Sequence, residues 1–204
     1  EATVLLEECD LAGWAQRVLA PHTQKVAVCE PRANLWIHRD AVKTDKIDAA
    51  KLSDIARLGN YKEVYHTTDE SIYELQVAVR AYDRLVGRVK ALKNQIKAEL
   101  RGAGVIAEGA GVYGKKGRQR ALALVASPLL REIIACEYEH LDFLVRSQAE
   151  AKRRFVRLGQ EVGIVLAWQE MPGVGPVGAA KFCAYIKCPH RLSLIHISEP
   201  TRPY

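Results

Sequence analysis

Two aspartates, Asp45 and Asp48, are the sharpest chemical signal in the sequence, and they lie in the segment Lys43–Ala49 (Lys-Thr-Asp-Lys-Ile-Asp-Ala). Residues three apart on a helix share one face, so the two carboxylates would lie side by side. Such a pair repels unless a cation neutralises it, and Mg²⁺ prefers oxygen ligands. Two bound metal ions can activate the attacking oxygen and stabilise the leaving oxygen in phosphodiester transfer. The simpler interpretation, which spacing alone favours, is that acidic residues suit a helix N-terminus because of the helix dipole.

A glycine-rich turn in the segment Met171–Phe182 is the second signal. Gly173 and Gly175 would let backbone N–H groups approach a DNA phosphate closely, and the N-terminus of the helix that follows favours that anion. The pattern is typical of a helix–hairpin–helix element, which holds the DNA backbone without reading sequence. A tight turn between two helices explains it equally well.

Four cations within six residues form the third signal, at the end of a glycine-rich stretch over 102–117; they are Lys115, Lys116, Arg118 and Arg120. We predict that they form a loop that contacts nucleic acid. A longer row of cations precedes them, and there the favoured interpretation is the solvated face of a coiled coil. This row comprises Arg84, Arg88, Lys90, Lys93, Lys97 and Arg101.

The elements over 1–66 predict a partial α/β domain. A short apolar stretch over 2–6 precedes a helix over 11–20, and the β-branched run over 25–29 is consistent with a buried strand. Thr44 then stands at the N-cap of a helix that Gly59 and Asn60 close. This places Asp45 and Asp48 in the first turn of that helix.

Apolar residues recur at alternating spacings of three and four in two later segments, 72–101 and 141–165. Heptad seams of this kind predict two long helices in a coiled-coil region over 67–168. The partner of each seam can be the other seam of the same chain, in an antiparallel hairpin, or a second copy in a homo-oligomer. Gln148 lies in the second seam and would fix its register.

The end of the chain divides into two further segments. Residues 169–191 hold the expected helix–hairpin–helix element. Residues 192–204 resemble a translated sequencing-library adapter, so we interpret them as an adapter-derived artefact and exclude them from the fold. The sequence begins at Glu1 rather than Met, and we expect the natural protein to extend beyond both ends.

Composition narrows the class of protein. The 204 residues are 49% hydrophobic and carry a formal net charge of +6, which weakly favours a polyanionic partner. No apolar run reaches the roughly 18 residues that span a bilayer, so no membrane partner is expected. Five scattered cysteines argue against a disulfide framework and favour a reducing, cytoplasmic compartment. Cys183, Cys188 and His190 match no zinc spacing.

Together these segments resemble the insertion-sequence one-ten family of transposases, which includes the Piv and MooV-type DNA invertases. Glu1–Thr3 looks like the family's Glu-Ala-Thr/Ser strand end, and Val26–Arg32 like the next strand and its Pro-Arg turn. Lys43–Ala49 looks like the Lys-Thr-Asp-x-x-Asp-Ala signature. Pro172–Gly175 and Pro189–Arg191 look like the start of the C-terminal transposase domain.

The resemblance implies a RuvC-like, RNase H-type catalytic domain whose Asp-Glu-Asp-Asp tetrad binds Mg²⁺. By matching position, Glu1 is the tetrad glutamate and Asp45 and Asp48 are its last two members. Three other glutamates are rivals for Glu1, and they are Glu7, Glu8 and Glu30.

The family also implies a first aspartate on an earlier strand, a nucleophilic serine beyond Arg191, and a guide-like RNA that bridges target and donor DNA. We therefore expect the fragment alone to be inactive. The leading hypothesis is a DNA transposase or site-specific recombinase that cleaves and rejoins strands with a divalent metal. The alternatives are a non-catalytic nucleic-acid-binding protein with a coiled-coil scaffold, and a scaffold with no nucleic-acid role.

Overall fold

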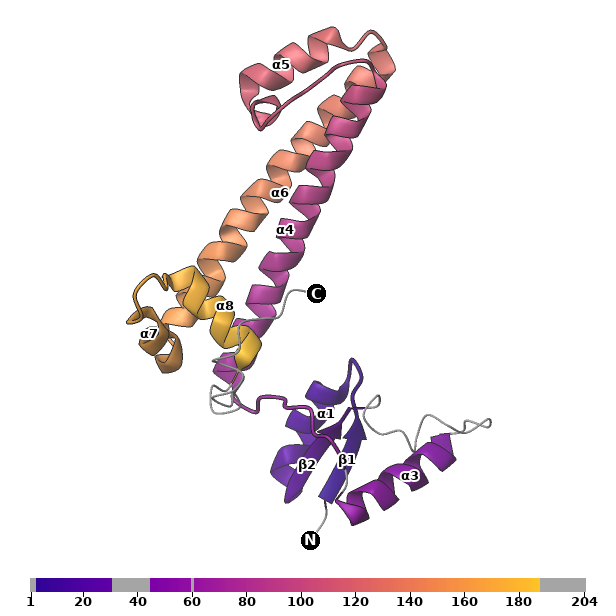
Figure 1. Cartoon of the computed structure of the whole chain (residues 1–204), viewed down its shortest axis with the longest axis vertical. Coiled ribbons are helices and arrows are strands. Elements are labelled where there is room, and N and C mark those ends of the chain that lie inside the picture. The colour runs from indigo at the N-terminus through magenta and orange to yellow at the C-terminus, as the bar shows by residue number, and fades with distance from the viewer. Residues whose placement is uncertain (1–2, 31–44, 60, 188–204) are drawn as a thin grey trace. The chain divides into compact units, whose positions relative to one another are not determined.

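The computed structural model describes residues 3–30, 45–59 and 61–187, and most of them are helical (Figure 1). They form two compact units that divide between Glu70 and Ser71. Among the described residues, no helix combines the length and the apolar character that a membrane crossing requires.

Two parallel strands, β1 (Thr3–Glu7) and β2 (Lys25–Cys29), form the sheet of the first unit. Parallel neighbours need a crossover connection, and here α1 (Ala12–Leu19) and the short 3₁₀ turn η1 (Ala20–His22) supply it. β2 is buried along Val26–Cys29, whereas β1 is half-buried. The strand predicted over 25–29 is confirmed, and the apolar stretch noted over 2–6 overlaps β1.

Helix α3 (Asp45–Leu58) packs on β1 through a face that includes the buried Ile55. Gly59 follows with φ +65°, a left-handed conformation that glycine adopts without strain and that commonly ends a helix. The predicted helix, opened at Asp45 and closed at Gly59, is therefore confirmed.

The chain then returns beside β2 in the opposite direction. The backbone N–H of Val64 donates to the Val28 carbonyl at 2.7 Å, and the N–H of Glu30 donates to the Lys62 carbonyl at 3.0 Å. These bonds cover the open edge of β2 and complete the first unit.

Two helices of 33 residues each, α4 (Glu70–Gly102) and α6 (Pro128–Gln160), form the frame of the second unit. They run antiparallel, because side chains near the start of α4 meet those near the end of α6 and the reverse (Figure 1). The Tyr82 and Phe155 rings lie 5.1 Å apart. The two apolar seams thus pair within one chain.

The seam between these helices is the larger part of the core. It joins buried residues of α4 to buried residues of α6, namely Val89, Leu92, Ile96 and Leu100 with Ile134, Tyr138, Leu141 and Leu144. The prediction that both seams face protein holds for these positions. Val86, which the heptad count also placed in the seam, is 37% exposed.

The second predicted long helix is present, but the bounds predicted for it, 141–165, were wrong. α6 begins 13 residues earlier, at Pro128, because Ser127 caps it by accepting a hydrogen bond from the Leu130 N–H at 3.3 Å. Proline at the first helical position is pre-set for a helix. α6 ends at Gln160, and Val162 instead caps a separate helix, α7 (Gly163–Gln169).

Residues 115–120 were predicted to form a loop, and this was also wrong. They open helix α5 (Lys115–Leu124), which follows the 3₁₀ turn η2 (Gly111–Tyr113). Arg118 ties α5 to α6, since its guanidinium donates to both carboxylate oxygens of Asp142 at 2.6 Å. Bidentate pairs of this kind are among the stronger hydrogen bonds in proteins.

Helix α8 (Pro176–Ile186) packs against α6 and α7. A Cβ on Gly159 would lie 3.0 Å from the Cβ of Ala180, so the α6 and α8 backbones approach closely there. Asp83 of α4 accepts from Lys181 Nζ at 2.7 Å and from the Tyr185 hydroxyl at 2.5 Å. The domain boundaries predicted at 168 and 191 stay predictions, and residues 192–204 lie outside the described part of the chain.

Two glycine substitutions test this packing in opposite directions. A Cβ on Gly117 would lie 2.0 Å from the Gly111 carbonyl oxygen, which is backbone and cannot rotate away. Gly117→Ala should therefore destabilise the chain by about 1–3 kcal/mol through overpacking. Gly87 is in the interior of α4 with nothing within 4 Å of its added Cβ, so Gly87→Ala should stabilise by up to ~1 kcal/mol. Urea unfolding measures both, and a Gly117→Ala chain as stable as the parent would contradict the η2–α5 packing.

Candidate functional site

The first turn of α3 carries the paired aspartates. Asp45 is the first residue of the helix, and its side chain lies outside the described part of the structure. Asp48 lies one turn later and shares a helical face with the buried Ile55, seven residues on. Its Oδ1 atom is buried and has no hydrogen-bond partner among the described residues.

A buried carboxylate oxygen without a partner is costly, because burial removes water and nothing replaces it. The cost disappears if a cation or a hydrogen-bond donor binds there. The Asp48 oxygen therefore fits a metal ligand. Among the residues that the structure describes, no three His, Cys, Asp or Glu side chains gather closely enough to hold a metal by themselves.

The candidate glutamates differ in what engages them. Glu1 lies outside the described residues and precedes β1, whereas Glu7 is the last residue of β1. Glu8 lies 2.7 Å from the Nε2 atom of His66. Glu30 lies 3.2 Å from Lys62 Nζ.

Of the rivals to Glu1, Glu7 alone has no such partner among the described residues. It also terminates the strand on which α3 packs. The resemblance placed the strand end at Glu1–Thr3, whereas β1 ends at Glu7.

The turn that holds Gly173 and Gly175 connects α7 to α8. Gly173 has φ +84°, which L side chains rarely adopt, so the turn requires glycine there. Gly175 caps α8 and Pro176 opens it. Both glycines are exposed, as a backbone contact with phosphate needs. The structure thus gives two helices joined by a tight turn, and the helix–hairpin–helix function stays a prediction.

The four cations predicted to contact nucleic acid fall into two groups: three are exposed, and one is held by contacts within the protein. Lys115, Lys116 and Arg120 are exposed on α5. The hydrogen bonds between Arg118 and Asp142 raise the pKa of the arginine and lower the pKa of the aspartate. The Arg118 guanidinium also lies 4.8 Å from the centre of the Tyr138 ring. Arg118 is therefore held within the protein while its three neighbours face solvent.

Comparison with known families identifies the segment that carries the aspartates. The family model of DEDD transposases of the IS110 type (DEDD_Tnp_IS110), described as a transposase, matches residues 8–104. This segment belongs to that transposase family. The match contains Asp45 and Asp48, and it begins at Glu8, so Glu1 and Glu7 lie outside it. A search of curated proteins found no match to the chain.

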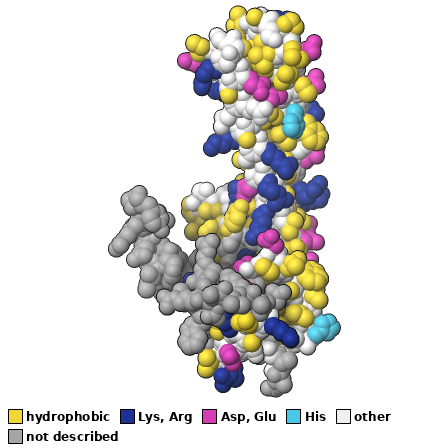
Figure 2. All heavy atoms as spheres, turned by 90° about the vertical axis from the view of Figure 1, so that its right-hand side faces the viewer, with side chains coloured by type: hydrophobic (Ala, Val, Ile, Leu, Met, Phe, Trp, Pro, Cys, Tyr) yellow, Lys and Arg dark blue, Asp and Glu magenta, His cyan; other side chains and the backbone are white. Residues whose placement is uncertain are grey.

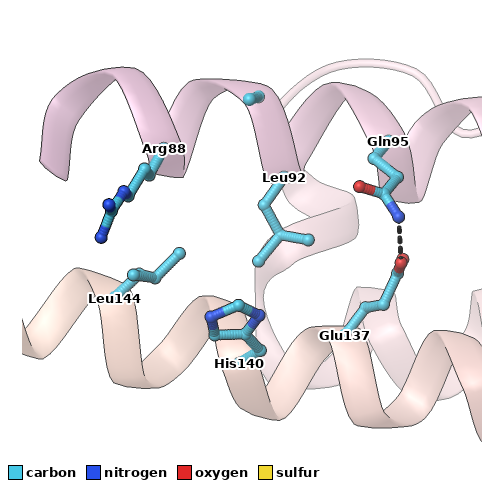
Figure 3. A pocket seen from close by; sticks show the side chains of 7 residues that line it. Arg88, Leu92, Gln95, Glu137, His140 and Leu144 are labelled. Atoms are coloured by element: carbon cyan, nitrogen blue, oxygen red, sulfur yellow. Dashed lines mark hydrogen bonds between the residues drawn. The ribbon is translucent and has the colours of Figure 1, made fainter. Parts of the chain in front are cut away.

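Away from the matched aspartates, a groove of about 380 Å³, which we call the acidic groove after its residue Glu137, lies along one edge of the α4–α6 interface (Figure 3). Gln95 donates from Nε2 to Glu137 Oε1 at 2.5 Å across it. The Oε2 atoms of Glu137 and Glu99 are both buried without a hydrogen-bond partner among the described residues. Burial, with Glu99 close by, raises the pKa of Glu137 to about 7.

This carboxyl pair predicts a specific pH dependence. The folded-state pKa of Glu137 lies above its ordinary value of 4.5, so the protonated pair stabilises the fold fully below pH 4.5. That stability is lost as the pH rises through about 7. Glu137→Gln cannot ionise and should therefore raise the melting temperature above pH 7 by a few degrees.

Thermal unfolding from pH 4 to pH 9 checks this prediction. Glu139→Gln, an exposed neighbour on α6, is the matched control and should follow the parent protein. Parallel melting curves for the parent and Glu137→Gln across that range would show that the pair shares no proton.

Proposed function

We propose that this transposase domain supports DNA strand cleavage and rejoining that depend on a divalent metal, Mg²⁺. The observation that carries the proposal is the buried, unpartnered Oδ1 atom of Asp48, one helical turn after Asp45. The family match spans both residues. A cation would satisfy this oxygen, and Mg²⁺ is bound through carboxylate oxygens.

Asp45 and Asp48 would hold the ion together with one glutamate. The sequence resemblance favours Glu1 for that role, and the structure adds Glu7 as a candidate, because it ends the strand on which α3 packs. A bound metal ion would supply activation of the attacking oxygen and stabilisation of the leaving oxygen. The packing of α3 on β1 fixes the first helical turn, so the chain's own contribution is to hold the two aspartates in position.

Metal binding can be tested without activity. Mg²⁺ should raise the melting temperature of the parent chain, since a ligand that binds only the folded state stabilises it by mass action. Asp48→Asn removes the buried charge. It should therefore melt higher than the parent without metal and lose the Mg²⁺-dependent increase. The readout is the melting temperature in a series from zero to about 10 mM MgCl₂. For a dissociation constant of about 0.1 mM, the highest concentration is about a hundred times that constant and gives a clear stabilisation.

Asp54→Asn is the matched control, because Asp54 lies on the same helix, is exposed and pairs with Arg57. It should keep the full Mg²⁺ effect. An equal Mg²⁺ effect in Asp48→Asn and in the parent would exclude Asp48 as a ligand. Salt-dependent DNA binding without any Mg²⁺ effect would favour the alternative, a non-catalytic nucleic-acid-binding protein.

We propose that the exposed cations of α5 and the turn between α7 and α8 contact the DNA backbone. Lys115, Lys116 and Arg120 supply charge, and the backbone at Gly173 and Gly175 supplies N–H donors. Arg118 is not a DNA contact in this proposal, because it already donates hydrogen bonds to Tyr113 and Asp142. Its role is to fix α5, so that the three exposed cations are held in position.

Removing the three exposed cations together, as Lys115→Ala, Lys116→Ala and Arg120→Ala, should weaken duplex binding and make it less sensitive to salt. Each lost phosphate contact changes the slope of log affinity against log salt by about 0.9. Titrations at 50 and 200 mM salt measure this slope. The control removes the same charge from exposed positions of α6, as Lys152→Ala, Arg153→Ala and Arg154→Ala. Equal slopes in the parent and the α5 variant would remove α5 from the DNA-binding surface.

RNA and a second copy of the chain remain proposed partners. The resemblance supports a guide-like RNA, which would supply the sequence recognition that backbone contacts lack. Self-association would need a surface other than the two seams, because those pair within one chain. Leu129, Ile133 and Phe143 are exposed and recur along one face of α6, so this face is the one we propose for a second copy.

A further inference from the structure

A second groove, of about 350 Å³, lies along the α4–α6 hairpin. On α4 its residues and those of the acidic groove flank the buried seam on opposite sides, as the 3.6-residue helical period requires. Its lining is basic and amide-rich, and no acidic residue is part of it. The polar lining residues are Lys90, Lys93, Asn94, Tyr113 and Gln148.

Three lysines form a row along this edge of α4. Lys90, Lys93 and Lys97 are separated by three and four positions, so they share one face and span about 10 Å of helix. Tyr113 orders two of them. The ammonium groups of Lys93 and Lys97 lie 5.0 and 5.6 Å from its ring centre.

The tyrosine is itself fixed, because its hydroxyl donates to the Lys93 carbonyl at 2.9 Å. Burial of Tyr113 raises the pKa of this hydroxyl, which keeps it protonated as a donor. With two ammonium groups over it, the ring serves to position cations.

The lysine row lacks the acidic neighbours that are common on a solvated helix face. On such a face, acidic residues three or four positions away stabilise exposed lysines. The positions three and four away from these lysines hold only apolar residues, glycine, asparagine and further cations. The pairs Lys90–Lys93, Lys93–Lys97 and Lys97–Arg101 therefore repel one another, and α4 carries the cost.

No ion pair within the described residues relieves this repulsion at Lys90, Lys93 or Lys97. Asp142, a carboxylate on α6, is already paired with Arg118. The uncompensated row differs from the solvated coiled-coil face that the sequence alone favoured. Figure 2 shows Lys and Arg side chains gathered around the middle of the helical hairpin.

We propose that this groove, lined by Lys90, Lys93, Asn94 and Gln148, binds the sugar–phosphate backbone of a nucleic acid together with Lys97, whose ammonium group lies over the ring of the lining residue Tyr113. About 10 Å of duplex axis carries about three phosphates on each strand, which matches three cations in a row. The amides of Asn94 and Gln148 add neutral donors beside them. All of these groups read phosphate and none reads bases, so binding is tolerant of sequence. The site uses neither the exposed cations of α5 nor the aspartates of α3, so it does not depend on the proposed metal.

The test replaces the lysines by a neutral residue of similar helix propensity, as Lys90→Gln, Lys93→Gln and Lys97→Gln in the full chain. Labelled duplex DNA, single-stranded DNA and duplex RNA are titrated at 50 and 200 mM salt. The slope against log salt on duplex DNA should fall by about 2–3 units, at about 0.9 per phosphate contact. Affinity at the lower salt should fall tenfold or more. The control is Lys152→Gln, Arg153→Gln and Arg154→Gln, which removes the same charge from α6.

A second variant separates positioning from charge. Tyr113→Leu keeps every lysine but removes the ring that orders two of them, so it should weaken binding without a change of net charge. The lysine variant itself should melt at or above the temperature of the parent, because repulsion along α4 is relieved. Circular dichroism confirms that both variants keep their helices.

Three results would overturn the proposal: an unchanged salt slope, an equal loss in the α6 control, or equally tight binding of polyglutamate, which would indicate an acidic protein partner. The lysine variant should keep the Mg²⁺-dependent increase in melting temperature. The salt titration therefore tests the groove proposal, and the Mg²⁺ melting series tests the metal proposal separately.

Discussion

The antiparallel pairing of α4 and α6 is the interaction on which the second unit depends. Ile96 and Leu100 from one helix, with Ile134 and Leu141 from the other, are fully or almost fully buried. At one end of the pair α5 is fixed by Arg118, and at the other end α7 and α8 pack around Phe155. Both ends are built on residues of α4 and α6, so the pairing of these two helices positions them.

The same pairing separates charge between the two edges of the interface. On one edge Glu99 and Glu137 are close enough to share a proton, and their repulsion is relieved from within by protonation. On the other edge no ion pair within the described residues relieves the repulsion among Lys90, Lys93 and Lys97. Like charges at helical spacing destabilise a helix. Protonation within the fold can therefore relieve the repulsion on the acidic edge, whereas the repulsion on the basic edge is the reason for which we propose a partner there.

Sequence periodicity and helix-ending residues predicted much of the fold. Thr44, Asp45 and Gly59 defined the helix of the aspartates, and the β-branched run over 25–29 defined the buried strand. Local patterns failed where a distant residue decides the outcome. Residues 115–120 were assigned to a loop because of the glycines around them, whereas the bond between Arg118 and Asp142, which are 24 positions apart, fixes them on α5. The glutamates could not be ranked for a similar reason, since the partner of Glu8 is 58 positions away.

The boundary of the family match is not a structural boundary. The match ends at residue 104, yet the apolar face of α4 is buried by residues of α6 that lie beyond it. A segment that stopped there would expose Leu92, Ile96 and Leu100 to water, at roughly 1.5–3 kcal/mol for each side chain. The basic groove crosses the same boundary, because its lysines lie inside the match while Tyr113 and Gln148 lie outside it. Residues beyond the matched segment are therefore needed both to bury the apolar face of α4 and to arrange its cations.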